Sequence, residues 1–187
     1  MEPEPQRQCV IPIHKPSLRE LAFFFSSGIL VSIPFALFFS QFYNLFPVVL
    51  AVVILAPFIE ELAKVFPLFY RHGETERSYV ILGILIGLGF GISEFVLYVF
   101  FLDVSPVARF SGIIFHSSSA AITAYGIAKK NPLPYYLLSV GLHIAINFFA
   151  ISGDLFSGVF ASLLVLISVY LLAWLYYHKA SRDRMVV

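Results

Sequence analysis

Two adjacent glutamates and a lysine lie inside an apolar stretch of the chain. Glu60, Glu61 and Lys64 fall within residues 46–69, where every other side chain is apolar. A charge at the centre of a membrane-spanning helix costs roughly 2.5–3.5 kcal/mol on insertion scales. Lys64 follows Glu60 by four residues and Glu61 by three, so on a helix it lies within reach of both. Because one lysine offsets only one carboxylate, we predict a functional role for the other.

Two prolines flank this group. Pro57 precedes Glu60 by three residues, and Pro67 follows Lys64 by three. Proline has no backbone N–H, so each proline removes one helical hydrogen bond. We therefore expect the helix to bend near the glutamates. We also expect a gap between helices at Pro57, through which an unwound substrate segment reaches the site.

Three other apolar stretches carry polar groups of the same kind. They contain Glu94 with Tyr98 four residues later, His116 alone, and His143 with Asn147 four residues later. A spacing of four places both members of a pair on one helix face. The structural alternative for Glu94 or His116 is a buried group that only hydrogen-bonds a neighbouring helix. Intramembrane ionisable residues more often mark functional sites, and we interpret these residues in that way.

The depth of these residues in their helices supports a common site. At 1.5 Å per residue from the expected cytoplasmic end, Glu60 lies roughly 16 Å deep and Glu94 roughly 22 Å deep. On the same scale His116 lies roughly 18 Å deep and His143 roughly 13 Å deep. All four fall near the middle of a hydrocarbon core of about 30 Å. The sequence therefore predicts one mid-membrane pocket built from four helices.

Carboxylates and imidazoles enclosed together support two kinds of chemistry. In the first, one of the glutamates or histidines takes a proton from water, while His143 and Asn147 donate hydrogen bonds to a developing oxyanion. In the second, the set binds zinc, which takes two or three His or Glu ligands together with a water molecule. The possible zinc ligands are Glu60, Glu94, His116 and His143. Both routes lead to hydrolysis of an amide bond within the membrane.

Signatures of other intramembrane proteases are missing from the sequence. It contains no His-Glu-x-x-His motif, which argues against a site-2-type metalloprotease, and no Gly-x-Gly-Asp motif, which argues against a presenilin-type aspartyl protease. The serines at 117–119 do not form a Gly-x-Ser-x-Gly or rhomboid-like pattern. The glutamates and histidines are therefore the candidates for the chemistry.

Six apolar segments must position these residues. Their predicted bounds are 21–40, 47–70, 79–102, 106–128, 135–152 and 155–178, each close to the ~20 residues that cross a bilayer as a helix. Ser17 and Glu20 form a predicted capping box before the first segment. Pro47 and Pro106 suit helix starts, and Ser78 is a predicted N-cap. The predicted fold is all-α, a polytopic membrane protein with about six transmembrane helices.

The basic residues predict the orientation of these helices. Of the 12 lysines and arginines, only Arg109 falls on the far side of the predicted spans, and Lys64 lies within one. The others cluster in the two tails and in the loops on one side. By the positive-inside rule, we expect both termini in the cytoplasm and a multi-pass location in the cell membrane.

Composition limits the alternatives further. The 187 residues are 59% hydrophobic and only 12% charged, whereas soluble domains carry about 25% charged residues. We therefore expect a single integral membrane domain over 1–187, with a cytoplasmic tail at 1–16. A net charge of +1 does not favour nucleic-acid binding. Cys9 is the only cysteine, so no internal disulfide is expected, and the polar N-terminal stretch does not resemble a cleavable signal peptide.

Small residues predict close helix packing. Gly83, Gly87 and Gly91 recur every four residues, and residues 117–121 are all serine or alanine. Such stripes let two helices approach closely. We expect them to hold segments 79–102 and 106–128 tightly against segment 47–70.

The polar motifs together resemble a known family. Glu60-Glu61-x-x-Lys64, Phe90-x-x-x-Glu94-x-x-x-Tyr98, His116 and His143-x-x-x-Asn147 resemble, in order, the motifs of the PrsW intramembrane proteases. That family is similar in turn to the superfamily of type II CAAX prenyl endopeptidases and bacteriocin-processing (Abi) proteins. The resemblance covers about residues 46–150. Glu94 stands where the CAAX branch has a histidine, and it points to the PrsW branch.

The resemblance implies roles for the site residues. Glu60 with Glu94, or with His116, activates water; His143 and Asn147 stabilise the oxyanion; Glu61 and Lys64 orient Glu60, and Tyr98 supports Glu94. Members are classed as metallopeptidases, so zinc is a candidate cofactor. The implied substrates are membrane-anchored proteins similar to anti-sigma factors.

Two other functional classes share some of these features. The anterior-pharynx-defective subunit of γ-secretase is similar to this superfamily and keeps two intramembrane histidines while serving as a non-catalytic scaffold. The complete glutamate pair at Glu60 and Glu61 favours an enzyme here. Buried Glu and His residues also form proton relays in transporters. The short chain and the absence of a recognisable sequence repeat argue against a transporter.

Overall fold

Six α-helices and three short helical segments account for most of the computed structural model, which describes residues 15–41, 45–70, 75–151 and 155–186. The α-helices are α1 (Leu18–Ser40), α2 (Ala56–Val65), α3 (Glu76–Val96), α4 (Pro106–Ala128), α5 (Pro132–Ile151) and α6 (Leu155–Lys179). The described residues include no β-strand beyond an isolated bridge between Thr75 and Met185. The all-α fold predicted from the apolar segments is confirmed.

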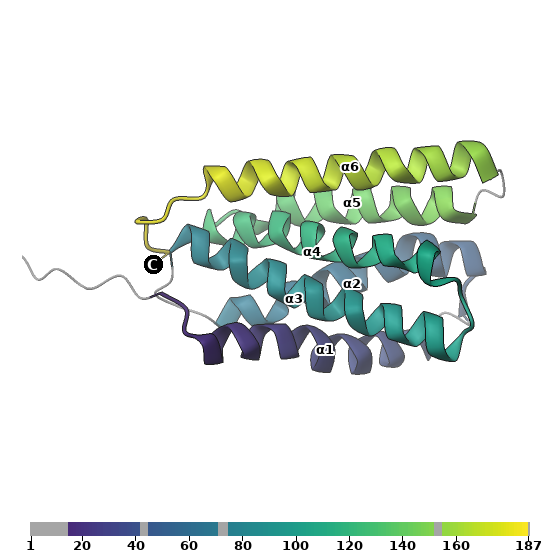
Figure 1. The fold of residues 1–187 in the computed structure, drawn as a ribbon, viewed down its shortest axis with the longest axis horizontal. Coiled ribbons are helices and arrows are strands. Elements are labelled where there is room, and N and C mark those ends of the chain that lie inside the picture. Colours follow the sequence, from purple (N-terminus) through teal and green to yellow (C-terminus); the bar gives the residue numbers. More distant parts are fainter. Residues whose placement is uncertain (1–14, 42–44, 71–74, 152–154, 187) are drawn as a thin grey trace, which may run out of the picture.

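The helices run along the long axis of the molecule, with α6 and α5 at one side and α1 at the other (Figure 1). α3 packs mainly against α4 and α1, and α4 also packs against α5 and α6. Much of α4 is buried from Phe115 to Ala128, because it contacts a neighbour on several faces. The central helix of the bundle is therefore the one that carries His116.

The segment that carries the glutamate pair changes its helical form twice. η2 (Leu50–Leu55) is a π-helix, α2 follows as a regular α-helix, and η3 (Phe66–Tyr70) is a 3₁₀-helix. Pro57 lies in the first turn of α2 and Pro67 lies in η3, so the irregular segments lie beside the two prolines. The chain over 47–70 is thus helical, as predicted, but it is not one uniform α-helix, because proline cannot supply the α-helical hydrogen bond.

Helix starts agree with the predictions in part. Ser17 N–H donates to Glu20 Oε2 at 2.7 Å and Glu20 N–H donates to Ser17 Oγ at 3.4 Å, so the predicted capping box is present. The predicted N-cap at Ser78 is wrong: α3 begins one turn earlier, and Thr75 Oγ1 accepts from Ser78 N–H at 3.2 Å. α5 likewise begins at Pro132 rather than at residue 135, because proline is favoured in the first turn of a helix.

The glycine stripe of α3 faces α4. A Cβ atom at Gly87 would overlap the carbonyl oxygen of His116, and one at Gly91 would lie 2.7 Å from Ile113 Cα. Close packing of these two helices was predicted, and the absent side chains allow it. In the structure the glycine stripe contacts α4. The sequence also predicted that it would hold α3 and α4 tightly against segment 47–70. The stripe therefore determines how close His116 comes to α3.

Three of the helical segments in the described residues are long and apolar enough to cross a membrane. They are Glu76–Phe101, which includes the π-helical segment η4 (Leu97–Phe101), Pro132–Ile151 and Gly158–Lys179. Six spans were predicted from the sequence. α4 carries Arg109, His116 and several hydroxyl groups, and α2 is only 10 residues long. Both features make these helices less typical of a lipid-exposed span.

Candidate active site

Four helices bring predicted site residues together inside the bundle. α2 carries Glu60, Glu61 and Lys64, α3 carries Glu94, α4 carries His116, and α5 carries His143. The rings of His116 and His143 have centroids 5.3 Å apart. Side chains separated by up to 83 positions in the sequence thus form one cluster of charged and hydrogen-bonding groups.

Lys64 is the centre of this cluster. Its Nζ donates to Glu61 Oε1 at 2.5 Å and to Ser119 Oγ at 3.0 Å, and it lies 3.0 Å from His116 Nδ1. An ammonium group has three N–H donors and no acceptor, so these contacts use all three. The side chains of Lys64 and Glu61 are both fully buried. Of the two glutamates within its reach, Lys64 therefore pairs with Glu61.

The two histidines have opposite hydrogen-bonding arrangements. Because Lys64 only donates, Nδ1 of neutral His116 accepts and Nε2 carries the hydrogen, directed at Glu94 Oε2 at 2.6 Å. In His143, Nδ1 lies 2.8 Å from Glu61 Oε1, which only accepts, so Nδ1 carries the hydrogen. The Nε2 lone pair of neutral His143 then faces Glu60, with Nε2 and Oε2 3.7 Å apart. This lone pair is available to a proton or a ligand.

Glu94 is held from two sides. His116 contacts one of its oxygens, and Arg109 Nη2 donates to the other, Oε1, at 2.9 Å. The Arg109 guanidinium also lies over the ring of Tyr98, 3.5 Å from its centroid. The Glu94 and Arg109 side chains are 21% and 29% exposed, so this end of the cluster reaches the surface of the bundle. Arg109 thus contacts both Tyr98 and Glu94.

Glu60 differs from the other two carboxylates. Glu61 has Lys64 and Glu94 has Arg109, but in the described part of the chain no lysine or arginine pairs with Glu60. Its buried Oε2 has no hydrogen-bond partner there, as is also true of Glu61 Oε2, but the other oxygen of Glu61 is bonded to Lys64 and His143. A buried carboxylate oxygen without a donor is costly unless a proton, a water molecule or a cation sits beside it. Glu60 is thus the carboxylate of the cluster without a lysine or arginine counter-charge among the described residues.

Asn147 lies on the same face of α5 as His143 but makes its contact elsewhere. Its Nδ2 donates to the backbone carbonyl of Val52 in η2 at 3.1 Å. One turn of helix separates this contact from the His143 contacts with Glu60 and Glu61. The amide has a second N–H beyond the one given to Val52.

Two members of the cluster were not among the predicted site residues. Ser119 accepts from Lys64 and donates to Glu61 Oε1 at 3.2 Å, and Arg109 pairs with Glu94. A signal for Arg109 existed in the sequence: it is the lone basic residue on its side and precedes His116 by seven residues, which is two turns on one helix face. No comparable signal distinguishes Ser119 from Ser117 and Ser118, because only the packing of α4 against α2 selects it.

Part of the cluster suits a divalent metal ion. Glu60, His116 and His143 offer ligand atoms that all lie within 4.8 Å of one another, and two His with one carboxylate is a common zinc donor set. The partnerless Oε2 of Glu60 and the Nε2 lone pair of His143 fit such an ion. Both nitrogens of His116 have protein contacts, so His116 would exchange one of them on binding. Glu94, a fourth possible ligand, is bonded to Arg109 and His116.

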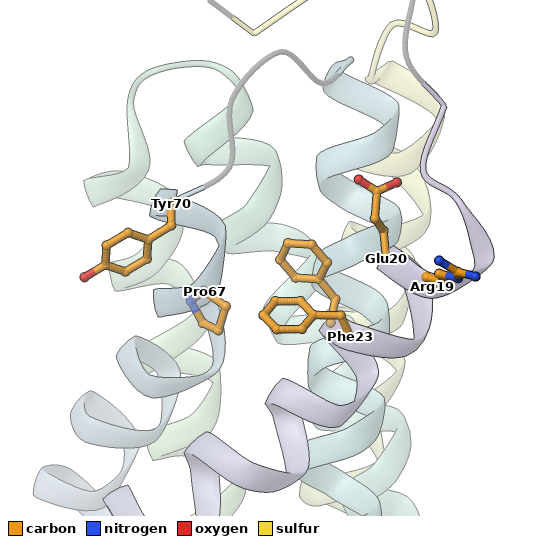
Figure 2. Close-up of a pocket in the computed structure, with 6 residues that line it drawn as sticks. Arg19, Glu20, Phe23, Pro67 and Tyr70 are labelled. Atoms are coloured by element: carbon orange, nitrogen blue, oxygen red, sulfur yellow. The ribbon is translucent and has the colours of Figure 1, made fainter.

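A surface pocket lies away from this cluster. It has a volume of about 380 Å³ and is lined by Arg19, Glu20, Phe23, Phe24, Pro67 and Tyr70, between α1 and η3 (Figure 2). None of the clustered residues lines it. The candidate active site is thus defined by its side-chain contacts inside the bundle.

A helical fold with apolar spans and a buried group of glutamates and histidines is compatible with a membrane hydrolase, and the comparison with protein families identifies the class. Residues 16–175 match the family described as PrsW family intramembrane metalloprotease. The chain belongs to this family and is an intramembrane protease that acts on membrane-anchored proteins in the bilayer. Neither the search of curated proteins nor the search of solved structures found a match.

Proposed function

We propose that Glu60 is the general base of this protease. The observation that carries the proposal is that Glu60 is the one carboxylate of the cluster without a lysine or arginine partner among the described residues; its Oε2 faces only His143 Nε2, at 3.7 Å. Glu60 takes a proton from a water molecule, whose oxygen attacks the scissile carbonyl carbon. The protonated Glu60 then gives that proton to the leaving amine, so that one water molecule is consumed for each peptide bond cleaved.

The other site residues support this step. Glu61 and Lys64 neutralise one another beside Glu60 and hold His143 through its Nδ1. His143, once protonated at Nε2, and the second N–H of Asn147 donate to the oxyanion. Glu94 and His116 form a hydrogen-bonded pair on the other side of Lys64. Either member of this pair is the second residue that assists the activation of water.

As an alternative to this metal-free step, we propose zinc for the site. Glu60, His116 and His143 would then hold the ion, in place of the proton-transfer and oxyanion roles given above, because two imidazoles and a carboxylate are ligands that zinc prefers. Bound there, zinc supplies a Lewis acid for the scissile carbonyl and lowers the energy needed to deprotonate a water molecule.

The setting of the enzyme is proposed from the sequence. We infer a single peptidase domain over 1–187 that crosses the cell membrane several times with both termini in the cytoplasm. Three apolar helices and the one-sided distribution of basic residues support this topology. Membership in the CAAX protease and Abi superfamily, and substrates similar to anti-sigma factors, rest on the motif resemblance.

The substitution Glu60→Gln tests the water-activating role. It keeps the size and removes the base, so cleavage of a single-span reporter protein should fall at least about 10³-fold in kcat. Yield and unfolding temperature should stay close to those of the wild type, because Glu60 makes no ion pair with Lys or Arg. A Glu60→Gln enzyme with wild-type turnover would remove Glu60 from the mechanism.

Metal analysis tests the zinc proposal separately. Purified protein should contain about one zinc per chain, and His143→Ala should lose most of it, since three protein ligands are typical of a catalytic zinc site. Chelation should abolish cleavage, and added zinc should restore it. Tyr70→Phe, in the pocket beside α1, serves as the control and should retain the metal. A preparation that is active without metal would reject the proposal.

A further inference from the structure

The backbone carbonyl of Val52 is not satisfied by its own helix. In an α-helix its donor would be the N–H of Ala56, but that group bonds to the carbonyl of Ala51 in the π-helical turn. In a continued π-helix the donor would be the N–H of residue 57, which is proline and has none. Asn147 Nδ2 donates to this carbonyl at 3.1 Å. A side chain of α5 therefore replaces the hydrogen bond that Pro57 removes.

α5 contacts the glutamate-bearing segment at three heights. Tyr136 Oη donates to the carbonyl of Phe58 at 2.7 Å, His143 contacts both glutamates, and Asn147 reaches Val52. Positions 136, 143 and 147 are spaced by seven and four residues, which places them on one face of the helix. This face of α5 thus binds the backbone on both sides of Pro57. The junction between η2 and α2 is therefore held by side-chain donors of α5 in addition to its own backbone bond from Ala56 to Ala51.

We propose that Asn147 is a positioning residue that holds the junction at Pro57 and thereby places Glu60. Glu60 follows Pro57 by three residues, one turn into α2, so a shift of the junction moves its carboxylate relative to His143. This role rests on the proposed function of Glu60. It is separate from oxyanion binding, because it uses the N–H that Asn147 gives to Val52 and acts through the backbone.

The substitution Asn147→Leu removes the donor and keeps the number of side-chain heavy atoms. It leaves the Val52 carbonyl without this side-chain donor, and because the contact is partly exposed, the unfolding temperature in detergent should fall by roughly 2–4 °C. The fluorescence of Trp174, the only tryptophan, reports the transition. Displacement of Glu60 should lower kcat for a single-span reporter protein about 10²-fold, with a smaller change in KM.

A second substitution distinguishes a positioning role of Asn147 from a direct part in the reaction. Pro57→Ala restores an N–H at position 57, and Val52 then gains a backbone donor: residue 56 in an α-helical junction or residue 57 in a π-helical one. In the Asn147→Leu background it should return the unfolding temperature to within about 1–2 °C of the wild type and raise kcat at least about tenfold. The matched control is Pro67→Ala in the same background, which should restore neither.

Several outcomes would overturn the proposal. Asn147→Leu with the unfolding temperature of the wild type would show that the Val52 contact does not hold the junction. An unfolding temperature restored by Pro57→Ala without any gain in kcat would assign Asn147 directly to the reaction. If the single variant fails to accumulate, recovery of its yield by Pro57→Ala, but not by Pro67→Ala, supports the proposal, and equal failure contradicts it. The unfolding and yield measurements are independent of the protease reaction, so they stand even if Glu60 is not the base.

Discussion

At the level of single residues, the lysine and the arginine of the cluster pair with two of its three carboxylates, and the third has no such partner among the described residues. Lys64 is matched to Glu61 and Arg109 to Glu94, with His116 between Lys64 and Glu94. Buried charges persist in proteins when they are paired and hydrogen-bonded. Two of the three carboxylates are thereby committed to holding the site together. The third, Glu60, lies beside the Nε2 of His143 and is the one to which we assign the activation of water.

Arg109 provides a test of this arrangement at its exposed end. Arg109→Gln removes the charge that holds Glu94 against His116, and we expect a loss of roughly 10–100-fold in kcat, as is typical when a supporting partner is removed. Arg109→Lys should recover part of this loss, because it keeps the charge but not the planar contact with Tyr98. Turnover of the single-span reporter protein is the measurement. Unchanged turnover in Arg109→Gln would show that Glu94 does not depend on Arg109.

At the level of elements, the site depends on how closely α3 and α4 approach. The carbonyl of His116 and the Cα of Ser117 occupy the space where a Gly87 side chain would be. His116 is therefore held against α3 by the absence of a side chain. Because backbone atoms on both helices form this contact, a larger residue cannot be accommodated by a change of rotamer.

Gly87→Ala should push the two helices apart. We expect a destabilisation of about 1–3 kcal/mol, the usual range for overpacking. We also expect reduced cleavage, because His116 would move away from Lys64. Gly141→Ala in α5 is the matched control, since a Cβ there meets nothing within 4 Å. The measurements are thermal unfolding and the rate of reporter cleavage for both variants. The same stability and the same cleavage rate in Gly87→Ala and Gly141→Ala would contradict the packing argument.

At the level of the whole molecule, one buried glutamate joins three distant parts of the chain. Glu76, in the first turn of α3, accepts from Lys129 at 2.8 Å, from the Ser181 N–H at 2.9 Å and from Arg184 at 3.3 Å. The C-terminal residues thereby lie over the start of α3, where Arg77 also donates to the carbonyl of Ala180. Glu94 is 18 residues further along, roughly 27 Å away on a straight helix. This closure of the C-terminal tail over the start of α3 is therefore remote from the candidate active site.

Glu76→Gln should separate stability from catalysis. It leaves Lys129 and Arg184 without their counter-charge, but both are partly exposed, so we expect only about 1–2 kcal/mol of destabilisation. The kcat of the folded enzyme should not change, because the closure lies a helix length from the cluster. Asp183→Asn, a neutralisation at an exposed position of the same tail, is the control and should have little effect. A selective fall in kcat would mean that this closure communicates with the site.

The helices and most of their ends were predictable because the signals are local. Apolar segments of about twenty residues, the Ser17–Glu20 capping box and prolines at helix starts depend only on neighbours in the sequence. The misplaced start of α3 has a tertiary cause: Glu76 is buried beneath the C-terminal tail, which makes the earlier turn favourable. The π-helical form of η2 was not predicted either, since Pro57 explains a missing hydrogen bond but does not say which other group replaces it.

The sequence by itself determined which groups would lie within the bundle. Six ionisable residues stand in apolar stretches, and burying them there is costly wherever the helices lie. They are Glu60, Glu61, Lys64, Glu94, His116 and His143. Only the tertiary structure decided which of them pair, because a buried charge binds the partner that helix packing brings within about 3 Å. Lys64 reaches both glutamates along its own helix, and the positions of His116, Ser119 and His143 assign it to Glu61. Because the packing of α4 and α5 directs Lys64 to Glu61, Glu60 is left without a lysine or arginine partner among the described residues.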